Sequence, residues 1–142
     1  MVYREEAYYK SEYSEVKKLR EKVETLAINF GFLNIYKENI EVSIGEIFTN
    51  VIKHGQSKVK NDVKVILEIN EEKFQIIFEY LGEIPSKERI EEVNQIKEVK
   101  DIFELKESGR GIYMVNRLMD SLEFERVEEI SKIKITKKLQ IF

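Results

Sequence analysis

The chain has 142 residues with 42% hydrophobic content, one proline and no cysteine, and it carries a net charge of −3. A chain of this length buries about two-thirds of its unfolded surface, so we expect one domain over residues 1–142. The negative net charge is not typical of nucleic-acid-binding proteins, which usually carry a basic surface. No apolar run approaches the ~20 residues that a membrane span requires. We therefore expect a cytoplasmic protein that binds neither nucleic acid nor a membrane.

The first part of the chain is predicted to be mainly helical. Apolar side chains recur at a helical period over Ser11–Phe30, and Gly31 follows where a helix-ending glycine belongs. A second helix is predicted over Tyr36–Lys53, with Gly55 just after it. Residues Val2–Tyr8 have the pattern of a short additional strand.

Two pairs of strands follow the helices. The stretches "DVKVILEIN" and "KFQIIFEYL" alternate apolar and polar residues on either side of the turn at 70–72, which predicts a hairpin. The stretches "SLEFERV" and "SKIKITKKL" alternate in the same way around Glu128 and Glu129. Helices on one face of a mixed, mostly antiparallel sheet would cover the apolar sides of these strands. The sequence therefore predicts an α/β two-layer sandwich.

The two strand pairs are separated by a segment of weak pattern and then by a helix. Residues 82–108 contain one or two helical turns near Ser86–Ile96, with Pro85 before them, and otherwise read as a mobile lid or a long connection. Helical spacing resumes in "GRGIYMVNRLMD", which predicts a third long helix from Gly109.

Three polar side chains share one edge of the second predicted helix. In "GEIFTNVIKHG", Glu46, Asn50 and His54 stand four residues apart. Four residues turn an α-helix by ~400°, which is only ~40° more than a full turn. The three side chains therefore form a row beside the apolar stripe. In a cleft, such a carboxylate serves as a base and such an amide ligates a hard cation. The alternative is an ordinary solvated helix edge.

Two glycines stand at the start of the third predicted helix, in "SGRGIYMVNRLMD". Gly109 and Gly111 are expected at the change from loop to helix, where glycine lets the backbone approach a phosphate closely. The free amides of the first turn and the helix dipole favour an anion there. The alternative is a loop end followed by an ordinary core helix.

The order of these motifs resembles the GHKL ATPase superfamily, which has the Bergerat fold of gyrase, Hsp90, histidine kinases and MutL. The nearest likeness is to the bacterial anti-sigma-factor serine/threonine kinases. Their N box, approximately E-x-x-x-N-x-x-x-H-G, stands here as "EIFTNVIKHG", and their later glycine box stands as "SGRGIYMVNRLMD". The likeness spans nearly the whole chain and implies a single histidine-kinase-like ATPase domain.

The resemblance implies a role for each matching residue. Asn50 would ligate the Mg²⁺ that bridges the phosphates of ATP, and Glu46 would act as, or orient, the base for a substrate serine hydroxyl. Gly109, Arg110 and Gly111 would hold phosphates under the lid. The other implied nucleotide-binding residues are Lys53, His54, Tyr80, Gly82, Ser108 and Ile112.

One segment departs from the family pattern. The family's Asp-x-Gly, whose aspartate accepts a hydrogen bond from the adenine amino group, corresponds here to "FEYLGEIP". Gly82 is kept, but Tyr80 stands at the aspartate position. Glu79 is adjacent, and in a regular strand it would point to the opposite face. The family's Gly-Thr-Thr in the last hairpin is also replaced, by Ser131 and Lys132.

The resemblance leaves three hypotheses for the function. The first is an ATP- and Mg²⁺-dependent serine/threonine kinase that is an anti-sigma factor, pairs as a homodimer, and phosphorylates an anti-anti-sigma partner. The second is a non-catalytic protein-binding module of the same fold with a degenerate adenine pocket. The third, the detached catalytic domain of a histidine kinase, is disfavoured because no dimerisation helix pair accompanies it.

Overall fold

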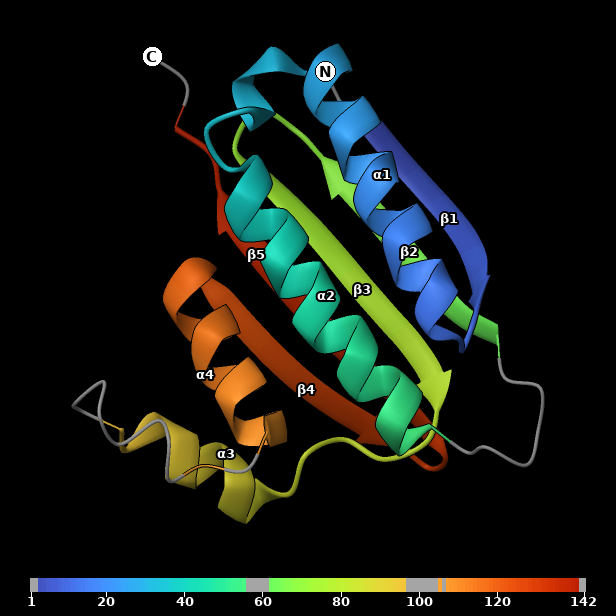
Figure 1. The fold of residues 1–142 in the computed structure, drawn as a ribbon, viewed down its shortest axis with the longest axis vertical. Helices are drawn as coiled ribbons and strands as arrows, with labels where there is room; N and C mark the ends of the chain where they lie inside the picture. Colours follow the sequence, from blue (N-terminus) through green and yellow to red (C-terminus); the bar gives the residue numbers. More distant parts are fainter. Residues whose placement is uncertain (1–2, 56–61, 97–104, 106, 141–142) are drawn as a thin grey trace.

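The computed structural model describes residues 3–55, 62–96, 105 and 107–140, which form a sheet and a layer of helices (Figure 1). The strands are β1 (Tyr3–Lys10), β2 (Asp62–Ile69), β3 (Lys73–Leu81), β4 (Ser121–Val127) and β5 (Ile130–Lys138). The helices are α1 (Tyr13–Asn29), the 3-10 turn η1 (Gly31–Leu33), α2 (Lys37–His54), α3 (Lys87–Asn94) and α4 (Glu107–Leu118). The predicted α/β two-layer fold is confirmed.

The strands form one sheet in the order β1-β2-β3-β5-β4. All four pairings of the described strands are antiparallel. The hairpins β2–β3 and β4–β5 are joined where β3 pairs with β5, for example at Ile76 opposite Ile135. This pairing also places Tyr80 opposite Ser131, so the end of β3 and the start of β5 lie together.

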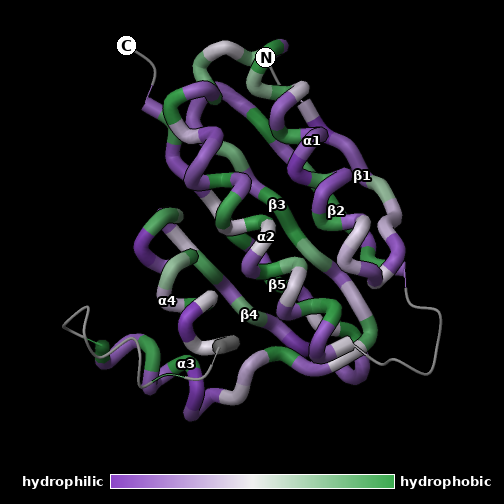
Figure 2. Tube along the Cα trace, viewed as in Figure 1, coloured by the Kyte–Doolittle hydropathy of each residue, from purple (hydrophilic) through white to green (hydrophobic). Residues whose placement is uncertain are grey.

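The core lies between the sheet and α1, α2 and α4, which cover one face of the sheet (Figure 1). Alternate strand residues such as Phe74, Ile76 and Phe78 are fully buried against the helices. The Phe48 ring of α2 lies 5.6 Å from the Phe78 ring, measured between centroids. Figure 2 shows the resulting mixture of hydrophobic and hydrophilic positions along each strand and helix. Each fully buried aliphatic or aromatic side chain of this kind contributes about 1.5–3 kcal/mol.

Most predicted element boundaries agree with the structure to within two residues, and two differences affect the argument. The strand β1 continues to Lys10, so α1 begins at Tyr13 rather than at Ser11. The helix α4 begins at Glu107, two residues before the predicted start at Gly109. Both glycines of the second motif are therefore inside the helix, and the prediction that they mark its boundary was wrong.

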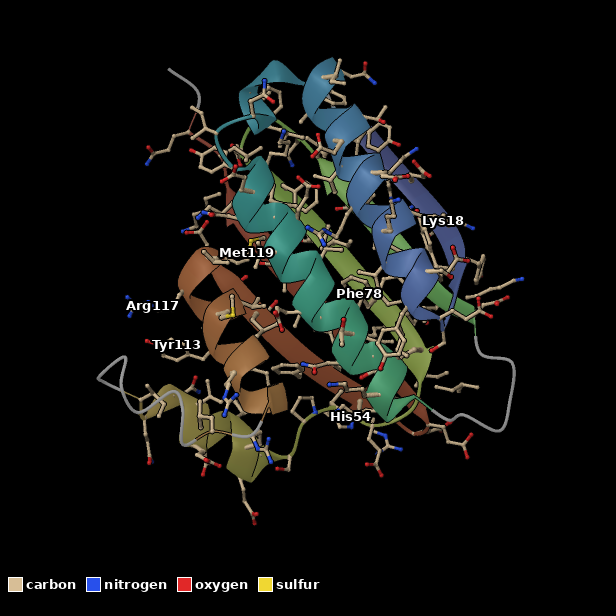
Figure 3. The ribbon with its side chains drawn as sticks, viewed as in Figure 1. Lys18, His54, Phe78, Tyr113, Arg117 and Met119 are labelled. Carbon is tan, nitrogen blue, oxygen red and sulfur yellow. The ribbon has the colours of Figure 1, made fainter. Side chains whose placement is uncertain are left out.

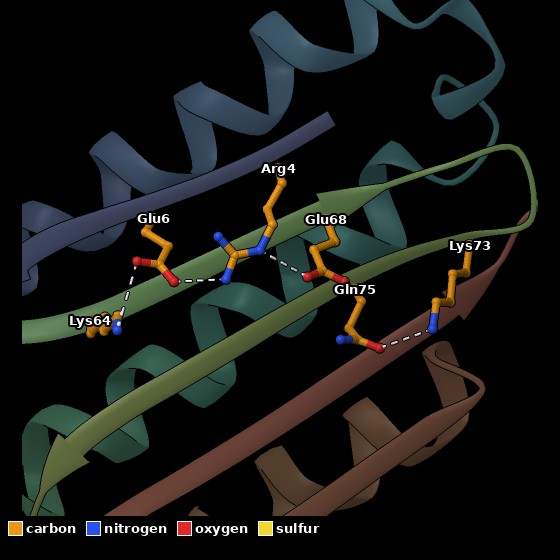
Figure 4. Close-up of polar contacts among 6 residues, drawn as sticks. All are labelled: Arg4, Glu6, Lys64, Glu68, Lys73 and Gln75. Carbon is orange, nitrogen blue, oxygen red and sulfur yellow. Dashed lines mark hydrogen bonds and ion pairs between the residues drawn. The ribbon is translucent and has the colours of Figure 1, made fainter. Parts of the chain in front are cut away.

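The other face of the sheet is polar (Figure 4). Arg4 lies 2.7 Å from the Glu6 carboxylate and 3.2 Å from that of Glu68, and Lys64 lies 3.7 Å from Glu6. Exposed pairs of this kind contribute at most about 1 kcal/mol each, so they specify the register more than they stabilise the fold. Within the described ranges no helix is long and apolar enough to cross a membrane.

Candidate functional site

The predicted polar row runs along α2 from a half-buried to an exposed position. Glu46 is half-buried, Asn50 is only 6% exposed, and His54 is exposed in the last turn beside exposed Lys53. Figure 3 shows His54 at the end of α2. Between described residues, no hydrogen bond engages the Asn50 amide. The described residues with a fully buried, unpartnered side-chain atom are Glu15 and Ser43, so the Asn50 amide keeps contact with solvent and can meet a ligand there.

The Glu46 carboxylate lies against the backbone of α4. A Cβ atom placed on Gly111 would be 2.6 Å from Glu46 Oε2, which is closer than atoms approach without displacement. The absence of a side chain at Gly111 thus lets the carboxylate reach the helix backbone. The N box and the glycine box, which are about 60 residues apart in the chain, meet at this contact.

Gly109 lets a different part of the chain approach α4. Residues two apart on a helix are separated by about 200°, so Gly109 and Gly111 face nearly opposite sides of α4. A Cβ on Gly109 would lie 3.4 Å from Arg89 Cδ and 3.4 Å from Leu105 Cβ. The two glycines thus allow close contacts on both sides of the first turns of α4, one with α2 and one with α3.

The remaining residues of the glycine box differ in how far they are buried. Arg110 is exposed and has an interaction partner. Ile112 is 1% exposed and packs in an apolar cluster with Val93, Leu105 and Tyr113. The side chain of Ser108 lies outside the described residues, as does the part of the predicted lid at 97–104.

The apolar cluster fastens α3, the described helix of the lid, onto α4. Asn116 on α4 also donates to Asn94 Oδ1 on α3 over 3.5 Å. Figure 3 shows Tyr113 and Arg117 on the outer side of α4, and the Arg117 Cζ lies 5.8 Å from the centroid of the Tyr113 ring. The apolar cluster and the Asn94–Asn116 bond therefore hold the lid helix alongside α4.

A connected group of backbone and side-chain bonds closes the opposite end of the site. Tyr80 is 3% exposed, and its hydroxyl donates to the Glu83 carbonyl over 2.7 Å. The Ser131 hydroxyl donates to the Gly82 carbonyl over 2.6 Å. The Glu83 amide donates to the carbonyl of His54 over 3.1 Å, which ties the end of α2 to the chain after β3.

Gly82 is required at this junction for two reasons. Its φ of +155° lies in the region that favours glycine, and a Cβ would be 2.7 Å from both the Gly55 Cα and the His54 carbonyl oxygen. The two glycines also form a β-bridge. Gly82 matches the family motif in the sequence, and its close packing against Gly55 and His54 is a second reason for glycine at this position.

Tyr80 is a neutral hydrogen-bonding group at this end of the site. Burial raises the pKa of the Tyr80 phenol far above its ordinary value, while Arg126 and Ser131 oppose that rise. The phenol therefore stays protonated at all physiological pH values. Glu79 belongs to the other face of the sheet, opposite Lys132 of β5. No bulge brings its carboxylate to the side of Tyr80.

The described residues fit the phosphate half of a Mg²⁺–nucleotide site better than the adenine half. The Asn50 amide has no hydrogen-bond partner among the described residues, and Glu46 lies beside the first turns of α4, where the dipole and the unpaired amides of a helix start favour anions. The described residues contain no group of three or more acidic, histidine or cysteine side chains that could hold a metal. Mg²⁺ is usually held by one or two protein groups together with substrate phosphates.

Comparisons with known proteins agree with this arrangement. The family model of the histidine kinase-like ATPase domain matches residues 9–137. The serine-protein kinase RsbW of Halalkalibacterium halodurans is 28% identical over 117 residues, covering 82% of this chain and 70% of the relative. The serine-protein kinase RsbW of Bacillus mycoides is 24% identical over 121 residues, covering 81% of this chain and 72% of the relative. The chain therefore belongs to the family of histidine kinase-like ATPase domains.

Proposed function

We propose that this protein is an ATP-dependent serine/threonine kinase that is an anti-sigma factor and phosphorylates an anti-anti-sigma partner. The observation that carries the proposal is the contact of the Glu46 carboxylate with α4 at Gly111, one helical turn along α2 from the nearly buried amide of Asn50. Two relatives named as serine-protein kinases support the same activity.

Each residue of the site has a proposed task. Glu46 would accept the proton of the substrate serine hydroxyl, and Asn50 would ligate Mg²⁺. The first turns of α4, from Gly109 to Gly111 with Arg110, would hold phosphate groups. Bound ATP supplies the phosphoryl group, and Mg²⁺ neutralises its charge. The proposed lining residues are Lys53, His54, Tyr80, Gly82, Ser108 and Ile112.

The proposal extends to the setting of the reaction. We expect a single domain over residues 1–142 that pairs as a homodimer in the cytoplasm and switches between a sigma factor and its antagonist. Phosphoryl transfer needs positioning and charge neutralisation more than covalent help from the protein.

Replacement of Glu46 by glutamine tests the catalytic role. Glu46→Gln keeps the shape of the side chain but removes its basicity, so the rate of phosphoserine formation on an anti-anti-sigma protein should fall by ~10²–10⁴. Mg-ATP affinity, measured by calorimetry, should stay within a few fold of the unmodified protein. Transfer by the variant at the original rate would remove Glu46 from the mechanism.

A second candidate function is a non-catalytic protein-binding module, and Tyr80 is the observation that favours it. A buried phenol that donates to the Glu83 carbonyl replaces the carboxylate expected to hold adenine. The two candidates differ in one measurable property, because only the kinase requires saturable binding of Mg-ATP.

A further inference from the structure

Ser43 on α2 has a fully buried hydroxyl without a hydrogen-bond partner in the described part of the chain. The residue is 0% exposed, and its Oγ bonds to no other group there. The other atom of this kind among the described side chains, Glu15 Oε2, lies 3.0 Å from Lys18 Nζ, so a charge compensates its burial. A buried hydroxyl without a partner destabilises the fold, and such departures from a satisfied core point to a functional site.

Ser43 lies on the side of α2 that faces α4. Ser43 and Asn50 are seven residues apart, so they lie within about 20° of each other round the helix. Glu46 is about 60° from Ser43 and one turn further along, and its carboxylate lies against α4 at Gly111. The three side chains therefore form one polar edge against α4, and the hydroxyl of Ser43 is its most deeply buried group.

The Glu46 carboxylate is within reach of this hydroxyl. In an α-helix a long side chain leans back over the preceding turn, and residues three apart have Cβ atoms about 5–6 Å from each other. The side chain of Glu46 therefore extends along α2 towards Ser43. Between described residues, no hydrogen bond or ion pair engages the Glu46 carboxylate. An unused donor and an unused acceptor are thus one turn apart, and a change of side-chain rotamer brings them together.

We propose that Ser43 is a positioning residue for the base of the kinase, and that its hydroxyl donates to one oxygen of the Glu46 carboxylate when substrate is bound. This inference rests on the function proposed above. The hydrogen bond fixes the carboxylate beside α4 and leaves its second oxygen to take the proton of the substrate serine. The serine oxygen bonds to the γ-phosphorus as the bond to the ADP oxygen breaks, and Ser43 keeps its own proton throughout.

The kinetics of phosphoserine formation on an anti-anti-sigma protein test the proposal on the full chain. Ser43→Ala should lower kcat by ~10- to 100-fold, because a hydrogen bond to a charged group is lost, and should leave the KM for Mg-ATP nearly unchanged. Ser43→Thr keeps the hydroxyl and should retain most of the rate. Thr25→Ala, which removes a hydroxyl from an exposed position of α1, should match the unmodified protein.

A double-mutant cycle tests whether Ser43 acts through Glu46. In the Glu46→Gln background, Ser43→Ala should lower the remaining rate by no more than about twofold, because the two side chains act as one unit. A full additional loss in that background would show that the hydroxyl acts elsewhere, and the proposal would be wrong.

Melting curves without ligand separate this role from a structural one. Since the hydroxyl has no partner in the ligand-free protein, Ser43→Ala should melt at or above the temperature of the unmodified protein. A clearly lower melting temperature would mean that the hydroxyl supports the fold, which contradicts the proposal.

The outcomes also distinguish this inference from the function on which it rests. If the unmodified protein transfers phosphate and Ser43→Ala does so with the same kcat, Ser43 has no positioning role while the kinase proposal stands. If the unmodified protein transfers no phosphate at saturating Mg-ATP, the proposed function fails and the inference fails with it.

Discussion

Tyr80 determines what the site can recognise at the end of β3. Its one hydroxyl hydrogen is used on the Glu83 carbonyl, so towards a ligand the oxygen can only accept. A neutral acceptor of this kind binds the adenine amino group more weakly than a carboxylate would. The purine should therefore add little to selectivity, and affinity should depend on the phosphates.

Substitution of Tyr80 tests whether this residue limits the recognition of adenine. Tyr80→Asp should raise ATP affinity by roughly 5- to 150-fold without a similar gain for GTP, because the carboxylate accepts a hydrogen bond from the 6-amino group of adenine, where guanine has a carbonyl oxygen. Calorimetry with both nucleotides measures the difference. Tyr80→Phe is the matched control, since it removes only the hydroxyl. It should cost about 1 kcal/mol of stability and leave the ratio of ATP to GTP affinity unchanged.

Strong preference for ATP over GTP in the unmodified protein would contradict this account. It would mean that a backbone group or a bound water is the adenine acceptor in place of Tyr80. The melting temperature of Tyr80→Asp must be measured alongside, because the position is in the core and a charge there reduces stability.

At the scale of elements, two carboxylates meet between α1 and α2. Glu24 on α1 and Glu41 on α2 are neighbouring carboxyls that shift each other's pKa, and Lys37 Nζ lies 3.2 Å from Glu24 Oε2. Burial, followed by the contact with Glu24, raises the pKa of Glu41. The hydrogen bond from Glu41 and then Lys37 lower the pKa of Glu24. The pair therefore favours one shared proton.

The pair makes the packing of α1 on α2 sensitive to pH. A carboxyl with a raised folded-state pKa stabilises the fold below its unfolded pKa, and this stabilisation is lost as the pH rises through the folded value. Glu41→Gln keeps a donor for Glu24 and removes the second charge. Its melting temperature should therefore exceed that of the unmodified protein by about 1–3 °C at pH 7, with the gap closing towards pH 4.

The control for this comparison is Glu92→Gln, which neutralises an exposed carboxylate on α3. Its melting temperature should equal that of the unmodified protein at pH 7 and at pH 4. A Glu41→Gln variant that melts below the unmodified protein at pH 7 would show that the carboxylate of Glu41 is stabilising, and that the pair does not share a proton.

The elements themselves were largely predictable from the sequence. The alternation of apolar residues predicted both ends of β3 and of β4 correctly, at Lys73–Leu81 and Ser121–Val127. Helical period predicted a helix over Tyr36–Lys53, and the structure has α2 at Lys37–His54. Alternation reports which side of a strand is buried but not which strand is its neighbour. The pairing of β3 with β5, which brings Ser131 to Gly82, could therefore be seen only in the structure.

The site was predictable in its residue types but not in its contacts. The step of four residues placed Glu46 and Asn50 on one edge of α2, and the structure shows the latter nearly buried. Helix geometry predicts that the two glycines of α4 face opposite sides, but which helices they face depends on where α2 and α3 pack. The contact of Tyr80 with the Glu83 carbonyl was missed for a similar reason.

At the scale of the whole molecule, the two halves of the site have different contacts, and α2 contributes to both of them. The bonds among Tyr80, Glu83, Gly82 and Ser131 fix the end near β3 and β5. The contact of Glu46 with Gly111 fixes the end near α4. A change at one end should therefore leave the other end intact, and phosphate binding should survive the loss of base recognition.

The most direct test of the central claim is a calorimetric titration of the unmodified protein and of Asn50→Ala with ATP, with and without Mg²⁺. The account predicts saturable binding by the unmodified protein that depends on Mg²⁺, and a loss of at least ~10-fold in Asn50→Ala, because the metal loses a ligand. Thr49→Ala, at the neighbouring half-buried position of α2, should bind like the unmodified protein. The claim is contradicted if millimolar Mg-ATP gives only heat of dilution, or if Asn50→Ala binds it as tightly as the unmodified protein does.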